Sequence, residues 1–330
     1  NTEIENQVLS INRKLRITRE LADTKYIAIA GTQSAGKTRL IREMYGLDHQ
    51  WLSDNAGRGE QLPLFILEHK ECTQPYAVVV EYNNDREQER KITSEELHTI
   101  LRNYNAENSI LLAKLYVPMK YFKQNNFGFV LLPGYEMETR ENQKWQQLMR
   151  HTLTHALGCI LVTDETRIAE NTQKRILDDL RSQYLENRQP IVAVTKTENL
   201  KDEKRVELRQ TVAEAFEFSE QQKVNIVLTG ADDDNYKKRW SSELMCAIMT
   251  TTLNSKQSEA AKYAELDYLL SDKVDDIISL SQTGLLEVDS IGTNSQAEKN
   301  INEILEKFDT ARDKFKRKYN KELTKQTHSY

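Results

Sequence analysis

Residues 31–38, GTQSAGKT, constrain the fold more than any other part of this sequence. They match the pattern G-x-x-x-x-G-K-[ST], follow the apolar run KYIAIA and precede the helical pattern TRLIREMYG. A strand, loop and helix in this order bring loop N–H groups and a helix N-terminus to one point, where they bind phosphate. Lys37 is expected to bring positive charge to the β- and γ-phosphates, and Thr38 a hydroxyl to Mg²⁺. The sequence therefore predicts a nucleoside di- or triphosphate site at this phosphate loop.

Short apolar runs alternate with helix-length segments along residues 24–231. The runs expected to be strands are 26–30, 64–67, 77–82, 127–132, 159–163, 191–195 and 224–229. Helices are expected at 142–156, 171–185 and 201–218. Strands rich in Val, Ile and Leu that are joined by helical crossovers are buried on both faces of a sheet. The pattern therefore predicts an α/β domain with a mostly parallel sheet.

Both ends of the chain show apolar residues at helical spacing, in residues 3–22, about 255–282 and 298–325. These stripes have no strand neighbours, so we expect them to pack together as a helical neck or bundle outside the α/β domain. The predicted domains are an N-terminal neck helix over 1–23, the α/β domain over 24–254 and a helical bundle or stalk segment over 255–330. Because the chain lacks an initiator Met and ends in a charged helical pattern, we expect this last segment to be truncated.

The composition excludes several classes of protein. With 38% apolar residues, 29% charged residues and a formal net charge of −5, the chain suits a soluble, helix-rich protein and gives no sign of nucleic-acid binding. No apolar run approaches the roughly 18–20 residues of a membrane-spanning helix, and the first residues lack a signal-peptide core. The three cysteines are odd in number and far apart in the sequence, so we expect free thiols and not disulfides, as in proteins of a reducing compartment. We expect a cytoplasmic protein.

The residues of three motifs resemble those of the dynamin superfamily of large GTPases, and in general character the sequence is most like the bacterial dynamin-like proteins. The first motif is GTQSAGKT itself, and the second is LLPG at 131–134, which resembles the switch II motif DLPG. The third is TKTE at 195–198, at the end of the run IVAVT, which resembles the guanine-specificity motif TKxD. The segment CILVTDETRIAENTQKRILDDL between them is similar to the strand and helix of that family. The sequence separation of Lys37 and Gly134 also suits dynamins better than small Ras-like GTPases.

The resemblance implies a P-loop GTPase domain that uses GTP/GDP and Mg²⁺, with Thr38 as a metal ligand. It implies a homodimer through the nucleotide face, or a partner subunit, and peripheral association with a membrane. Gln33 and Ser34 match residues that place water and a charge-compensating cation, and Glu60 joins them as the third catalytic candidate. The nucleotide-binding residues that it implies are Gly31, Thr32, Gln33, Ser34, Ala35, Gly36, Lys37, Thr38, Gly134, Thr195, Lys196, Glu198 and Thr229.

Three positions depart from the family pattern. Leu131 stands where switch II has its Asp, Glu60 where switch I has its Thr, and Glu198 where TKxD has its Asp. A glutamate at position 198 can still accept the two N–H groups on the edge of guanine. The other two changes remove groups that orient the metal and the attacking water, on which phosphoryl transfer depends. We therefore expect GTP binding with slow or absent hydrolysis, coupled to dimerisation, movement of the helical bundle and remodelling of a membrane or partner.

Two alternatives remain open at this point. One is a pseudo-GTPase scaffold that binds nucleotide without turnover. The other is a P-loop ATPase in which Asp164 and Glu165, after the run ILVT, act as a Walker B pair that holds Mg²⁺ and polarises water. Nucleotide preference separates the ATPase from the GTPase, and turnover separates the scaffold from both.

Two weaker patterns each allow two interpretations. His151, His155 and Cys159 have a spacing that suits a metal site, but Cys159 begins a predicted strand and the histidines are expected on a helix surface. The basic stretch 312–325 suits contact with anionic lipid, or the solvated face of a helical bundle, which we favour.

Overall fold

The computed structural model describes residues 2–53, 60–83, 86–103, 109–122, 127–136, 142–168, 189–231 and 233–254, with Asp178 and isolated positions between 303 and 317. The chain divides into two compact units, one of Asn1–Asn12 with Gln257–Tyr330 and one of Arg13–Lys256. Most of the predicted helices at 255–282 and 298–325 lie outside the described residues, so the neck bundle and the domain limits stay predictions. Within the basic stretch, Asp313, Lys314 and Arg317 are helical and exposed.

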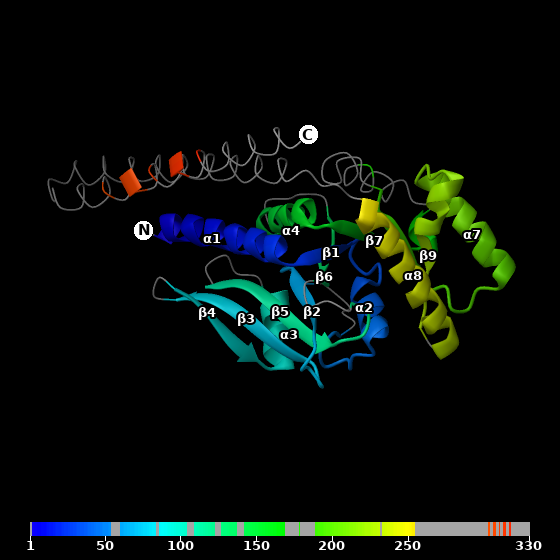
Figure 1. Ribbon diagram of the computed structural model, residues 1–330, viewed down its shortest axis with the longest axis horizontal. Helices are drawn as coiled ribbons and strands as arrows, with labels where there is room; N and C mark the ends of the chain where they lie inside the picture. The colour runs from blue at the N-terminus through cyan, green and yellow to red at the C-terminus, as the bar shows by residue number, and fades with distance from the viewer. Residues whose placement is uncertain are drawn as a thin grey trace. The chain divides into compact units, whose positions relative to one another are not determined.

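A mixed sheet forms the centre of the larger unit (Figure 1). In spatial order the described strands are β4 (Arg86–Ile92), β3 (Tyr76–Asn83), β5 (Ile110–Pro118), β2 (Leu64–His69), β6 (Phe127–Leu131), β1 (Lys25–Ala30), β7 (Gly158–Asp164), β8 (Ile191–Thr195) and β9 (Ile226–Leu228). From β6 to β9 all neighbours are parallel, while β2–β6, β5–β3 and β3–β4 are antiparallel. The expected parallel sheet is therefore confirmed for the half that carries the phosphate loop, and the other half is mixed.

All seven predicted runs form strands, and the structure adds β4 and β5. In β4 every residue except the last is exposed, so its sequence REQERKI has no apolar signal. It forms because β3 offers an unpaired edge along its whole length. By contrast, β5 was not among the expected strands, although ILLAKLYVP is mostly apolar and is largely buried.

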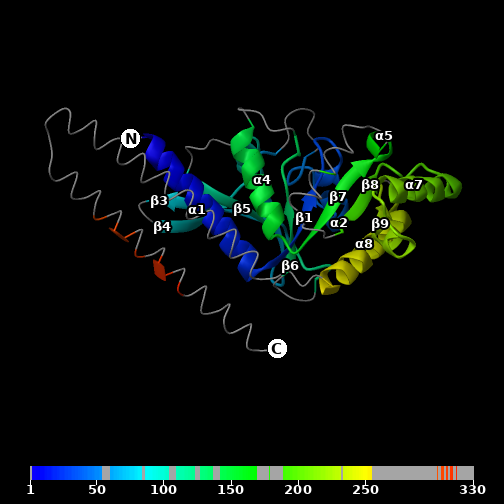
Figure 2. The same cartoon turned by 90° about the horizontal axis from the view of Figure 1, so that it is seen from above.

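The helices of the described residues cover both faces of the sheet. They are α1 (Thr2–Asp23), α2 (Lys37–Tyr45), α3 (Ser94–Arg102), α4 (Gln143–His155), α5 (Glu165–Ile168), α7 (Asp202–Ala215), α8 (Asp234–Asn254) and the 3₁₀ helix η1 (Glu220–Asn225). The second half of α1 lies with α4 over one face, and α2 lies on the other (Figures 1 and 2). The predicted helices at 142–156 and 201–218 are present, and 171–185 lies outside the described residues apart from Asp178. No helix in the described part of the chain has the length and apolar character needed to cross a membrane.

The second half of α1 belongs to the α/β domain. Ile17 lies in the core of the domain. Arg13 Nε donates a 2.8 Å hydrogen bond to a backbone carbonyl of β5, and Glu20 forms a buried 2.9 Å ion pair with Lys114 of the same strand. The expectation that residues 3–22 lie wholly outside this domain is therefore wrong from Arg13 onward. The buried charges fix how the helix sits on the sheet.

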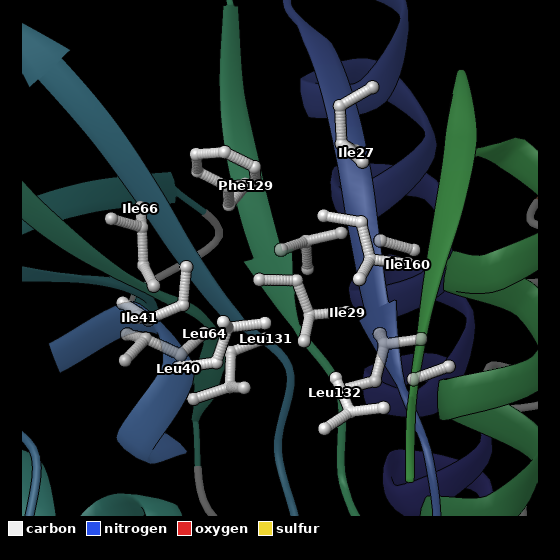
Figure 3. Packing of buried hydrophobic residues seen from close by; sticks show 14 of the residues in the cluster. Ile27, Ile29, Leu40, Ile41, Leu64, Ile66, Phe129, Leu131, Leu132 and Ile160 are labelled. Atoms are coloured by element: carbon white, nitrogen blue, oxygen red, sulfur yellow. The ribbon is translucent and has the colours of Figure 1, made fainter. Parts of the chain in front are cut away.

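The core between β1, β6, β2 and α2 contains Leu131 (Figure 3). This side chain is fully buried, and its backbone is paired with Ile29 on one side and Leu64 on the other. Leu40 of α2 lies close to it in the same cluster. Leu131 is thus a core residue of the sheet, and the fold does not need an acidic side chain at this position.

Candidate functional site

The phosphate loop joins β1 to α2 and passes very close to the neighbouring strands. Gly31 has φ +147°, and a Cβ at this position would lie 2.3 Å from the carbonyl oxygen of Val162 in β7. Gly36 has φ +98°, and its Cβ would lie 3.1 Å from the Thr195 side chain in β8. Only glycine combines these backbone angles with the small volume that each position allows. The two glycines therefore hold the loop across the ends of the parallel strands.

Lys37, the first residue of α2, is buried under this loop. Its Nζ donates to the carbonyl oxygens of Gly31 at 3.1 Å and Thr32 at 2.9 Å. Burial lowers the pKa of Lys37 to about 8, although the nearby Glu60 carboxylate opposes the shift. A phosphate group at the loop would stabilise the charged form that burial disfavours. Lys37 is thus a buried cation that a bound anion would stabilise.

Thr38 and Glu60 meet at the C-terminal side of the loop. Thr38 Oγ1 donates a 3.1 Å hydrogen bond to Glu60 Oε1. Hydroxyl and carboxylate oxygens are ligands that Mg²⁺ accepts, so this pair fits such an ion. Gln33 is half-buried and Ser34 is exposed, with a left-handed backbone at φ +59°. The structure therefore brings Thr38 and Glu60 together, although they are distant in sequence.

The turn after β6 rests on the phosphate loop. A Cβ on Gly134 would lie 3.0 Å from the Cα of Gln33, and the Tyr135 N–H donates to the Gly31 carbonyl at 3.0 Å. Gln146 of α4 donates to the Gly134 carbonyl at 2.9 Å and holds the turn in place. Gly134 is therefore adjacent to the loop as expected, while Leu131 points into the core.

A pocket opens on the other side of the loop, between α2, the end of β8 and the start of α8. We call it the Glu198 pocket. Thr195 connects it to the loop, because its Oγ1 donates to the Ala35 carbonyl at 2.8 Å. The Thr229 N–H donates to the Val194 carbonyl at 2.7 Å and fixes the opposite wall. The pocket is lined by Gly36, Arg39, Leu40, Glu43, Thr195, Lys196, Glu198, Thr229, Gly230 and Trp240.

The carboxylate of Glu198 is only partly satisfied. Its Oε1 lies 3.6 Å from Arg39 Nη2, but its Oε2 is buried and accepts no hydrogen bond from the described residues. Gly230 makes room for it, since a Cβ on this glycine would lie 2.5 Å from Oε2. A buried acceptor without a donor costs free energy unless a ligand supplies one. An N–H donor that reached Oε2 from outside the chain would remove this cost.

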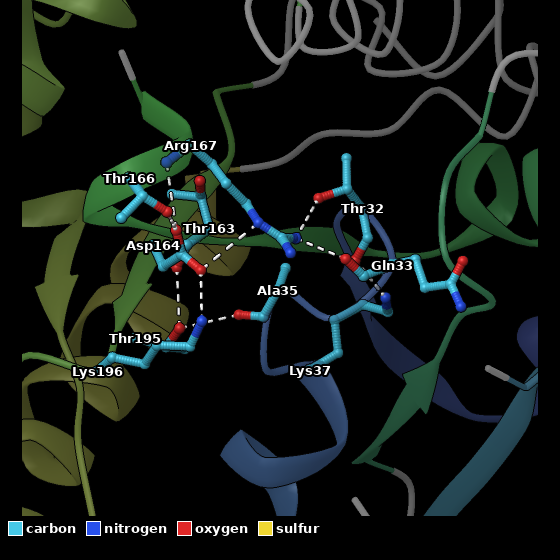
Figure 4. A network of polar contacts seen from close by, with 10 residues as sticks. All are labelled: Thr32, Gln33, Ala35, Lys37, Thr163, Asp164, Thr166, Arg167, Thr195 and Lys196. Carbon is cyan, nitrogen blue, oxygen red and sulfur yellow. Dashed lines mark hydrogen bonds and ion pairs between the residues drawn. The ribbon is translucent and has the colours of Figure 1, made fainter. Parts of the chain in front are cut away.

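Asp164, at the end of β7, lies at the centre of a polar network (Figure 4). Its Oδ2 accepts from Lys196 Nζ at 2.7 Å, and its Oδ1 accepts from Thr166 Oγ1 at 2.7 Å. Burial alone raises the pKa of Asp164, but these hydrogen bonds outweigh it and hold the pKa below its usual value. Arg167 extends from the same network to the phosphate loop, where its Nη1 donates to Thr32 Oγ1 at 2.8 Å.

The network bears on the Walker B interpretation. The two Asp164 oxygens already accept hydrogen bonds from Lys196 and Thr166, and Glu165 is exposed. The hydroxyl of Thr38 contacts Glu60 instead. This arrangement favours Asp164 as an anchor for Lys196 over a metal-binding role.

Six residues of the site were not predicted from the sequence, namely Arg39, Leu40, Glu43, Gly230, Trp240 and Arg167. Arg39 and Gly230 line the Glu198 pocket, and Arg167 contacts the loop. Gly230 directly follows Thr229, and a glycine at a strand end next to a predicted site is a usable signal. Nothing in the sequence distinguishes Arg39 or Arg167 from other surface arginines.

The two histidines of α4 are not on the surface. His151 and His155 are both buried, and His151 Nε2 lies 2.9 Å from Thr18 Oγ1 of α1. Burial holds the pKa of His151 well below its usual value. Within the described ranges, no group of three His, Cys, Asp or Glu residues is arranged to hold a metal ion. The surface expectation is wrong because α1 covers this side of α4, while Cys159 is buried in β7 as expected.

In the comparisons with known proteins, this chain matches solved structures only. No protein-family model and no curated protein matches this sequence. Two structures of an oligomerised bacterial dynamin pair, described as sensing and tethering membranes over long range, match with 16% identity and a TM-score of 0.49. They cover 83% of this chain and 43% and 42% of theirs. A point variant of Era from Aquifex aeolicus, bound to GDP·AlF₄⁻, matches with 12% identity and a TM-score of 0.38 over 68% of this chain and 56% of its own.

This chain is structurally similar to a bacterial dynamin and to Era. It spans less than half the length of the bacterial dynamin chains.

Proposed function

We propose that this protein binds guanine nucleotides, GTP and GDP. The observation that carries the proposal is the buried Glu198 Oε2, to which none of the described residues donates, in a pocket next to the phosphate loop. Guanine presents two adjacent N–H donors on one edge, and adenine has no such pair. A polar site of this kind rejects a base that leaves its acceptor unpaired. Lys37 and the loop N–H groups supply the matching site for the phosphates.

We propose that Mg²⁺ accompanies the nucleotide, held by Thr38 together with Glu60. When bound, the ion would neutralise charge on the β- and γ-phosphate oxygens. Glu60 keeps its carboxylate within hydrogen-bond distance of Thr38, whereas Leu131 cannot anchor a metal-bound water from the core. Gln33 and Ser34 are the candidates that position the attacking water. With this incomplete set, we propose slow hydrolysis of GTP.

The first prediction concerns nucleotide preference. Lys37→Ala is expected to lower GTP affinity at least tenfold, because it removes a charge-assisted contact worth roughly 1.5–3 kcal/mol. Glu198→Ala is expected to weaken GTP binding while hardly affecting ATP binding. The measurement is a fluorescence titration of the purified chain with labelled GTP, GDP and ATP, with and without Mg²⁺.

The matched control is Glu203→Ala, which removes an exposed carboxylate from α7 outside the pocket. This variant should bind all three nucleotides as the parent protein does. If the parent protein binds ATP more tightly than GTP, the assignment of the pocket to guanine is wrong, and the ATPase interpretation takes its place.

The second prediction is that phosphate release from GTP is slow or absent in the isolated chain. The buried Leu131 supports it, since loss of one positioning contact costs about 10²–10³-fold in rate. Phosphate release is measured over a range of protein concentrations, with Lys37→Ala as the blank. An increase with concentration would point to dimerisation across the nucleotide face. Fast turnover that is independent of concentration would show that other residues complete the site.

The pseudo-GTPase scaffold is the second candidate function, and the place of Leu131 in the core specifically favours it. For either function we propose a cytoplasmic protein that forms a homodimer or binds a partner subunit, and that does not bind nucleic acid. We also propose that movement of the neck transmits the nucleotide state, with peripheral membrane association and remodelling. These steps are supported by the motif resemblance at 31–38, 131–134 and 195–198.

A further inference from the structure

Arg167 contacts the phosphate loop from a different part of the chain. It lies in α5, directly after β7, and its Nη1 donates to Thr32 Oγ1 at 2.8 Å and to the Gln33 carbonyl at 2.5 Å. Lys37 reaches the same short stretch of the loop, where it donates to Gly31 and Thr32. Two cations therefore converge on residues 31–33.

Within the described residues, the guanidinium is anchored by a carboxylate at one end and bonded to neutral groups at the other. Asp164 holds the Nε end at 3.5 Å and accepts the Arg167 backbone N–H at 3.2 Å. The Nη1 end bonds a hydroxyl and a carbonyl, which carry no net charge. In these bonds only the donor is charged, whereas a phosphate oxygen would make both partners charged and could accept two parallel N–H bonds from the planar guanidinium. An arriving phosphate oxygen is therefore a better partner for Nη1 than its present acceptors.

Arg167 and Lys37 are two like charges close to the same loop. Asp164 carries one negative charge against two cations, Arg167 and Lys196. Arg167 adds to the effect of burial in lowering the pKa of Lys37, so the two cations repel each other across the loop, while the carboxylates of Glu60 and Glu136 act in the opposite direction. Anionic phosphate oxygens bound at the loop would relieve this repulsion.

The position of Arg167 points to the terminal phosphate. The loop N–H groups enclose the α- and β-phosphates, and the γ-phosphate extends beyond them. Gly134, in the switch-like turn, packs on Gln33, whose carbonyl accepts from Arg167. The cation and the turn therefore meet at the same residue of the loop.

We propose that Arg167 binds the γ-phosphate of GTP and makes the site prefer the triphosphate to the diphosphate. This inference rests on the proposed function, since it concerns the same nucleotide. Asp164 acts as a positioning residue, because its carboxylate holds Arg167 on the phosphate side and Lys196 on the side of the Glu198 pocket. In this proposal the positive charge of Arg167 contacts the γ-phosphate, the group that GTP has and GDP lacks.

The experiment compares the affinities of Arg167→Gln for a non-hydrolysable GTP analogue and for GDP, both fluorescently labelled, with Mg²⁺. We expect at least a tenfold loss for the GTP analogue and less than about threefold for GDP, the size of one lost charge-assisted contact. Arg167→Lys, which keeps the charge without the planar fork, should fall between the parent protein and Arg167→Gln. Arg19→Gln is the matched control, because Arg19 is 67% exposed on α1 and its loss should change neither affinity.

Unfolding curves of the nucleotide-free variants show whether each one is folded. If Arg167→Gln is unstable, the ratio of GTP-analogue to GDP affinity in Arg167→Lys decides the question in its place. Equal losses for both nucleotides, or no loss, would overturn the role of Arg167 while the effect of Lys37→Ala upholds nucleotide binding. A parent protein that binds neither nucleotide would overturn both proposals.

Discussion

Gly31→Ala is expected to lower the free energy of unfolding by about 3 kcal/mol or more. At φ +147° any side chain strains the backbone, and here the added Cβ would lie 2.3 Å from the Val162 carbonyl oxygen. That oxygen belongs to the backbone of β7, which is paired with β1 on one side and β8 on the other, so it cannot move aside without breaking the sheet. The measurement is denaturant unfolding followed by circular dichroism.

Gly46→Ala is the matched control. Gly46 also has a left-handed backbone, with φ +65°, but no atom lies within 4 Å of the position that its Cβ would take. Only backbone strain remains, and we expect a cost of about 1 kcal/mol. Equal losses in the two variants would show that the approach of the loop to β7 is looser than in the structure.

Leu131→Asp is expected to lower the free energy of unfolding by about 3 kcal/mol or more at pH 7, although it restores the acid of the switch II motif. The carboxylate would lie in the apolar cluster with Leu64 and Leu40, without a partner (Figure 3). Burial raises the pKa of such a group above its unfolded value of about 3.9, so the cost should be smaller near pH 4 than at pH 7. Unfolding at both pH values measures this difference.

Leu131→Met serves as the control, because a swap that conserves volume should cost less than about 1.5 kcal/mol. A stable Leu131→Asp variant with faster, Mg²⁺-dependent GTP turnover would mean that this side chain faces the nucleotide and not the core. The explanation for slow hydrolysis given above would then be wrong.

The sequence by itself determined the phosphate loop, the strands around it and the position of TKTE. These features depend on the order of residues within short stretches of the sequence. Gly31 and Gly36 occupy fixed positions between a strand and a helix, and runs such as 191–195 are apolar throughout, as buried strands require. Glu198 was found through the resemblance of TKTE, at the end of the run 191–195, to the guanine-specificity motif.

Only the tertiary structure decided which distant residues meet. Arg167 and Thr32 are 135 positions apart in the sequence, and their hydrogen bond exists because β7 lies beside β1. The burial of His151 depends on the side of α4 that α1 covers, and β4 is a strand only because β3 offers it an edge. Hydrophobic periodicity records which residues are buried, but it carries no information on strand order or on the partner across an interface. Those are fixed by the packing of the whole chain, and the polar network between the loop and the Glu198 pocket follows from it.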